Sequence, residues 1–144
     1  MFKRLYWRYY KLRASFRRRR RLLFPSPAEL RLIVIMGGRV VQIKRLRDPS
    51  TGFPLALVIK WPKVFKHEFV RREVRCGPYY IDFGNDIGRG IEIDGRAYHT
   101  DVVAAFERDS YLYQRNWLIM HIPALWLWNN PVKVQQLVIG HLTK

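Results

Sequence analysis

The chain has 144 residues and a formal net charge of +16, and 49% of its residues are apolar. This length fits one domain with a buried core, and the apolar content excludes a disordered polymer of charge. The single cysteine, Cys76, excludes a disulfide framework or a cysteine-rich zinc site and agrees with a reducing, cytoplasmic compartment, while no apolar run predicts a transmembrane segment.

The first predicted element is a basic arm at residues 1–25. Residues 1–24 contain ten of the 27 Lys and Arg residues, interleaved with aromatic residues, and no acid. Arginine binds phosphates through bidentate hydrogen bonds and aromatic rings stack on bases, so we expect a helix that binds nucleic acid. A helix on an anionic membrane and a tail that docks on an acidic protein are the alternatives. The binding residues expected in the arm are Lys3, Arg4, Arg8, Lys11, Arg13, Arg17, Arg18, Arg19, Arg20 and Arg21.

A helix is predicted to open the second unit, which spans residues 26–144. Ser26 supplies a capping hydroxyl, a proline follows in the first turn, and Glu29 lies near the positive end of the helix dipole. The helix is expected to end at the glycine pair 37–38. Its β-branched segment, residues 33–35, leaves a strand as the alternative there.

The middle of the chain predicts five short strands, and the last part predicts a helix, a strand and a second helix. Turn-rich residues separate the first two strands, so a hairpin is expected there. This order predicts an α/β fold with a small mixed sheet flanked by helices. The strands are expected at residues 39–45, 55–61, 69–76, 79–83, 90–94 and 117–122, and the helices at 102–116 and 131–142.

Acidic residues gather on two of these strands. Strand alternation places Ile91 and Ile93 on one face of the sheet and Glu92 and Asp94 on the other. Neighbouring carboxylates repel each other unless a cation or a bound proton offsets their charge. Asp82 lies on the preceding strand, and the three acids together predict a divalent-metal site. The alternatives are a solvated Asp82 near a turn and a Glu92 paired with an arginine of a neighbouring strand.

Three segments in order resemble a known family. They are Tyr80-Ile81-Asp82-Phe83, Gly90-Ile91-Glu92-Ile93-Asp94-Gly95 and Tyr98-His99. This order resembles the PD-(D/E)XK restriction-endonuclease-like superfamily, most closely the small single-domain branch related to very-short-patch repair endonucleases. The resemblance extends over residues 26–143. It implies a restriction-endonuclease-like core and a metal-dependent DNA endonuclease that hydrolyses phosphodiester bonds.

The resemblance also assigns roles to the acidic residues. Asp82 and Glu92 would bind Mg²⁺, for which Mn²⁺ would substitute, together with the carbonyl oxygen of Ile93. Glu29 would bind a second metal or a metal-bound water. All four are therefore expected metal-site residues, and the metal would activate water for attack on the phosphodiester.

Several positions carry the remaining expectations. Asp94 stands where the superfamily usually has a lysine, so it would add a ligand or hold a metal-bound water. His99 would transfer a proton or hydrogen-bond a phosphate, and Arg108 would contact the nucleic acid. His121 stands where an arginine is common, and Ala104 stands near the usual place of another acid.

The expected partner is DNA, with a homodimer or a larger nucleoprotein complex as further partners. A single small domain is expected to nick one strand. The alternative is a nuclease-fold DNA-binding subunit of a larger nucleoprotein machine, catalytically silent or activated by its partners. A third hypothesis is an RNA-associated structural protein whose basic arm binds folded RNA.

Overall fold

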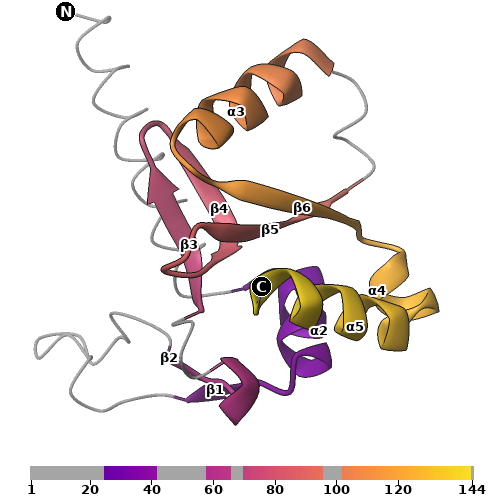
Figure 1. The fold of residues 1–144 in the computed structure, drawn as a ribbon. Helices are drawn as coiled ribbons and strands as arrows, with labels where there is room; N and C mark the ends of the chain where they lie inside the picture. Colours follow the sequence, from indigo (N-terminus) through magenta and orange to yellow (C-terminus); the bar gives the residue numbers. More distant parts are fainter. Residues whose placement is uncertain (1–24, 42–57, 66–69, 96–101, 144) are drawn as a thin grey trace, which may run out of the picture.

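The computed structural model describes residues 25–41, 58–65, 70–95 and 102–143 (Figure 1). The helix expected in the arm lies outside these residues. In the part that the structure describes, no helix combines the length and the apolar content needed to cross a membrane.

A four-stranded sheet forms the middle layer of the molecule, in the order β3-β4-β5-β6. The strands β3 (Arg71–Cys76), β4 (Tyr79–Gly84) and β5 (Arg89–Asp94) pair antiparallel. The strand β6 (Leu118–Pro123) runs parallel to β5.

Helices lie on both sides of this sheet. Helices α2 (Pro27–Ile35), α4 (Trp126–Asn129) and α5 (Pro131–Leu142) lie on one side, and α3 (Val102–Gln114) lies on the other (Figure 1). The predicted α/β class, with a small mixed sheet flanked by helices, is confirmed. The short helix α4 was not predicted.

Helix α2 begins where the capping residues predict. The Glu29 amide donates to Ser26 Oγ at 3.2 Å, and the Ser26 amide donates to Glu29 Oε1 at 3.4 Å. This reciprocal pair satisfies two backbone donors at the start of the helix. The β-branched segment remains helical up to Ile35 because Leu32 and Ile33 are buried in the core.

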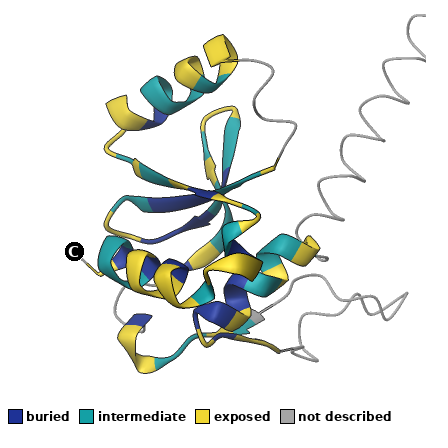
Figure 2. Ribbon diagram, turned by 90° about the vertical axis from the view of Figure 1, so that its right-hand side faces the viewer, coloured by how far each residue is buried: buried dark blue, intermediate teal, exposed yellow. Residues whose placement is uncertain are grey.

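The main core lies between the sheet and helices α2 and α5 (Figure 2). Phe83 and Ile91 from adjacent strands are fully buried, as are Val134 and Val138 from α5. On the other side of the sheet, α3 buries Leu112. The predicted alternation of β5 is confirmed for its apolar face, because Ile91 belongs to this core.

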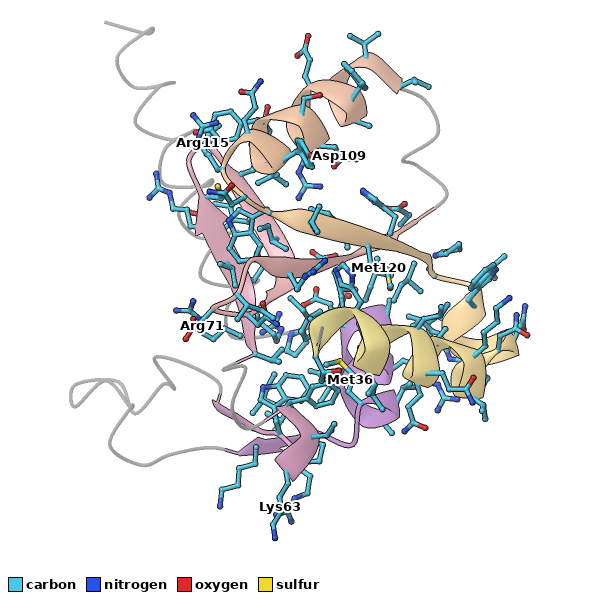
Figure 3. The ribbon with its side chains drawn as sticks, in the orientation of Figure 1. Met36, Lys63, Arg71, Asp109, Arg115 and Met120 are labelled. Atoms are coloured by element: carbon cyan, nitrogen blue, oxygen red, sulfur yellow. The ribbon has the colours of Figure 1, made fainter. Side chains whose placement is uncertain are left out.

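A separate two-stranded sheet follows α2. Strands β1 (Arg39–Val41) and β2 (Val58–Lys60) pair antiparallel, as the expected hairpin requires, and a short 3₁₀-helix, η2 (Lys63–Phe65), comes next. Lys63 extends away from the fold (Figure 3). Between β2 and η2, the Trp61 ring packs edge-on against Phe65 and Phe83, with centroid distances of 6.1 and 6.2 Å. This contact fixes the small sheet to the main one.

Candidate functional site

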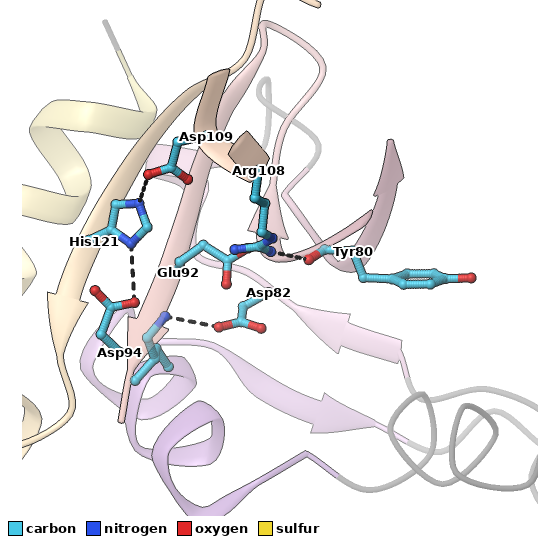
Figure 4. Close-up of polar contacts among 8 residues, drawn as sticks. Tyr80, Asp82, Glu92, Asp94, Arg108, Asp109 and His121 are labelled. Atoms are coloured by element: carbon cyan, nitrogen blue, oxygen red, sulfur yellow. Dashed lines mark hydrogen bonds and ion pairs between the residues drawn. The ribbon is translucent and has the colours of Figure 1, made fainter. Parts of the chain in front are cut away.

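Asp82 and Glu92 lie where β4 and β5 separate. The ladder between these strands pairs Phe83 with Ile91 and stops before the next step, which would place Asp82 opposite Glu92. At that step the Asp82 carboxylate accepts the Ile93 amide N–H at 2.9 Å (Figure 4). The Asp82 carboxylate thus takes the place of a backbone acceptor for the Ile93 amide. Asp82 and Glu92 meet at the open end of the β4–β5 hairpin.

The other ladder of β4 is interrupted at the same residue. The β3–β4 register runs continuously except at one position, where Glu73 stands opposite Asp82. Glu73 has a φ of 49°, in the left-handed region that non-glycine residues rarely adopt. Such a backbone costs on the order of 1–3 kcal/mol and persists only where surrounding contacts enforce it. Asp82 therefore lies at a local irregularity of the sheet on both sides.

Burial changes the ionisation of both acids. Glu92 is 3% exposed. Its burial and then the negative charge of Asp82 raise the pKa of Glu92 to about 8, against the opposing effect of Arg108. Burial also raises the pKa of Asp82, although its hydrogen bond from the Ile93 amide acts in the opposite direction. The pair thus favours a bound proton or a bound cation, as expected for carboxylates that share a buried site.

Arg108 on α3 is the ion-pair partner of Glu92. One of its guanidinium nitrogens donates to Glu92 Oε1 and also to the Tyr80 carbonyl, the latter at 2.6 Å. The guanidinium lies 5.8 Å from the centre of the Tyr79 ring, and the side chain is 13% exposed. The alternative expected from the sequence placed this partner on a neighbouring strand, whereas it comes from the covering helix.

Glu29 forms a second buried ion pair at the edge of the acidic pair. Arg72 donates to Glu29 Oε2 through Nε at 3.0 Å and Nη2 at 2.6 Å. The two side chains are 7% and 13% exposed for Arg72 and Glu29, respectively. The charge of Glu29 is close enough to contribute to the raised pKa of Asp82. The structure therefore brings Glu29, Asp82 and Glu92 into one neighbourhood.

Asp94 belongs to a different contact, which the sequence did not predict. Its Oδ1 lies 3.1 Å from His121 Nδ1, and Asp109 Oδ2 lies 2.9 Å from His121 Nε2 (Figure 4). The contact depends on the parallel pairing of β5 with β6. In that register His121 is the partner of Glu92, and this places it on the strand beside Asp94. Because each ring nitrogen faces a carboxylate, the ring can donate to both acids only as an imidazolium.

The remaining predicted site residues are placed as follows. Ile93 donates its amide to the Asp82 carboxylate. His99 and the cations of the arm lie outside the described residues. A shallow surface hollow at the start of α5 is lined by Asn129, Asn130, Lys133 and neighbouring residues, and no acid of the site reaches it.

The donor set can be compared with what a metal requires. Within the described ranges, no group of three or more Asp, Glu, His or Cys side chains is arranged to hold a metal ion. Magnesium, however, often binds through one or two carboxylates, with waters and substrate phosphates as the other ligands. Asp82 and Glu92 supply two hard oxygen donors whose repulsion a divalent cation would offset. The residues present therefore fit a magnesium ion in donor chemistry.

Comparisons with known proteins add no relative. No family model matches the sequence, and neither a curated protein nor a solved structure matches it.

Proposed function

We propose that this protein is a Mg²⁺-dependent endonuclease that hydrolyses DNA phosphodiester bonds by attack of water. The observation that carries the proposal is the meeting of Asp82 and Glu92 at the opening of the β4–β5 hairpin. Both are largely buried, and burial raises the pKa of each carboxyl, an effect that Arg108 offsets only in part. A bound divalent cation would offset this repulsion and use both carboxylates as ligands.

The arrangement of elements supports a restriction-endonuclease-like core. A helix carrying Glu29 precedes an antiparallel set of strands that carry Asp82 and Glu92. A helix and a parallel strand follow, in the order that the resemblance to PD-(D/E)XK endonucleases implies. This order places acids from three separate segments in one neighbourhood.

The residues around the acids have distinct roles in this proposal. When bound, Mg²⁺ would polarise a phosphoryl oxygen and lower the pKa of a coordinated water. Asp82 and Glu92 would hold the ion, with the Ile93 carbonyl and Glu29 as further oxygen donors. The Ile93 amide orients the Asp82 carboxylate through its hydrogen bond.

The other polar residues would orient the acids, hold a water, transfer a proton or bind the DNA. Arg108 orients Glu92 and neutralises part of its charge. Asp94, whose carboxylate lies within hydrogen-bond distance of His121, would hold a metal-bound water. In this proposal His99 accepts or donates a proton near the reacting phosphate. The arm supplies affinity for DNA that does not depend on base sequence.

A nicking assay on supercoiled plasmid in Mg²⁺ tests the proposal. Asp82→Asn and Glu92→Gln should each lower the nicking rate by more than the roughly 10–100-fold that loss of an outer partner of a metal ligand costs. Both variants should bind DNA as tightly as the unmodified protein in EDTA. Asp86→Asn is the matched control, because it removes an equal charge from an exposed acid. Full nicking by either site variant would contradict the assignment.

A second candidate is a nuclease-fold DNA-binding subunit without activity of its own. Two observations favour it: Arg108 and Arg72 already pair with Glu92 and Glu29. Calorimetry with Mg²⁺ or Mn²⁺ distinguishes the two functions when it is combined with the nicking assay. DNA binding without metal binding or nicking would favour the silent subunit.

A further inference from the structure

The small sheet β1–β2 carries positive charge on both of its strands. Arg39 and Lys60 are direct partners in the antiparallel register, so their side chains leave the sheet on the same side. Lys63 follows at the start of η2, and all three residues are exposed. Lys63 points away from the rest of the fold (Figure 3). These three residues are called the basic ribbon below.

The basic ribbon has no counter-charge in the described part of the chain. The described residues of β1, β2 and η2 include no acid. None of the three cations forms an ion pair with an acid whose position is described. Like charges directly opposite each other on two strands are destabilising. Removing the charge of Arg39 or of Lys60 would therefore stabilise this sheet when nothing is bound to it. A bound polyanion offsets this repulsion.

The basic ribbon is attached firmly to the main fold. The indole N–H of Trp61 donates to the Val70 carbonyl at 2.7 Å, and Phe65 is 1% exposed. A Cβ atom at Gly38 would lie 2.8 Å from the Trp61 ring, so β1 can begin beneath this ring only with glycine there. The segment that carries the three cations is therefore fixed to the main fold.

We propose that the basic ribbon binds the phosphate backbone of duplex DNA. The choice of DNA rests on the proposed function, whereas the need for a polyanion rests on the paired cations alone. A membrane-binding surface keeps aromatic rings exposed beside its cations. Here Trp61 and Phe65 face the core instead, and this favours a phosphodiester backbone over a lipid surface.

The salt dependence of DNA binding tests this proposal. Affinity for a short duplex is measured in EDTA over a range of salt concentrations, with the triple variant Arg39→Gln, Lys60→Gln, Lys63→Gln. The slope of log affinity against log salt should fall in magnitude by about 2–3, since each phosphate contact contributes about 0.9. An unchanged slope would overturn the proposal.

A matched control separates a local site from net charge. The triple variant Arg71→Gln, Arg115→Gln, Lys133→Gln removes the same charge from exposed cations on other elements. It should change the slope by less than about one contact. An equal loss in both variants would overturn the proposal, as would reduced binding to phosphatidylserine vesicles with unchanged DNA binding. Because these measurements need no cleavage, a failure to nick DNA leaves them interpretable.

Lys60→Glu provides a second variant whose stability and binding should change in opposite directions. It places a carboxylate opposite Arg39, so the melting temperature at low salt should rise while DNA affinity falls. Unchanged DNA affinity in a folded Lys60→Glu protein would contradict the proposed contact.

Discussion

At the scale of single residues, the balance between burial and pairing decides how each acid behaves. Glu92 has a neighbouring acid and one arginine, and burial outweighs the arginine, so its pKa rises to about 8. Glu29 has a buried arginine on one oxygen and a backbone amide on the other. These two acids therefore have different electrostatic environments.

The stability of the protein should depend on pH through Glu92. The pKa of Glu92 is about 8 in the folded protein and ordinarily 4.5, so between these values unfolding releases a proton. The free energy of unfolding should therefore fall as the pH rises through this window, by on the order of a few kcal/mol. The raised pKa of Asp82 acts in the same direction. Urea denaturation at pH 5 and pH 8 measures the fall, which should be smaller in Glu92→Gln. An equal fall in both proteins would exclude Glu92 as its source.

Two adjacent arginines on β3 provide a matched test of buried and exposed ion pairs. Arg72→Met removes the cation beside Glu29, which is 13% exposed, and should cost about 3–5 kcal/mol. Arg71→Met breaks an ion pair with Asp86 whose side chains are 61% and 51% exposed, and should cost about 0–1 kcal/mol. Chemical denaturation compares the two variants. Equal costs would show that the Glu29 pair is not buried in solution.

At the scale of helices and strands, the sequence predicted most elements and one face of the central strand. The capping residues predicted the start of α2, and the asparagine-proline pair predicted the start of α5. Helix α4 was missed because it spans only Trp126–Asn129 and has no side-chain cap. A segment this short has no helical period from which it could be recognised.

Two glycines in different elements should respond oppositely to alanine. Gly77 has a φ of 57° in the turn between β3 and β4, and a Cβ there would collide with the Tyr111 hydroxyl. Gly77→Ala should therefore lower the free energy of unfolding by at least about 1–3 kcal/mol. Gly140 lies in α5 with open space beside it, so Gly140→Ala should raise that energy by about 0.5–1 kcal/mol. Thermal melting measures both, and destabilisation by Gly140→Ala would contradict the open packing seen at that position.

At the scale of the whole molecule, the sheet brings together acids that lie far apart in the sequence. Strand alternation alone could indicate that Asp82 and Glu92 belong to one site. It could not predict Arg108 or His121, because α3 and β6 reach the site only through tertiary packing. Nor could it show that Asp94 turns toward His121 rather than joining the other acids. The sequence thus indicated the acids, and the fold determined their partners.

Positive charge is concentrated in two parts of the chain. The basic arm accounts for much of the excess charge in the sequence, while the basic ribbon adds paired cations on a segment fixed to the main fold. In the proposed function these surfaces hold the DNA backbone, and the acidic pair acts on one phosphodiester.

The most direct test of the acidic pair as a metal site is a crystal soaked in Mn²⁺ at a pH above 8, where Glu92 is ionised. The proposal predicts anomalous density bridging the carboxylates of Asp82 and Glu92, and its loss in Asp82→Asn crystals treated in the same way. Well-ordered carboxylates with no Mn²⁺ between them in the unmodified protein would contradict it.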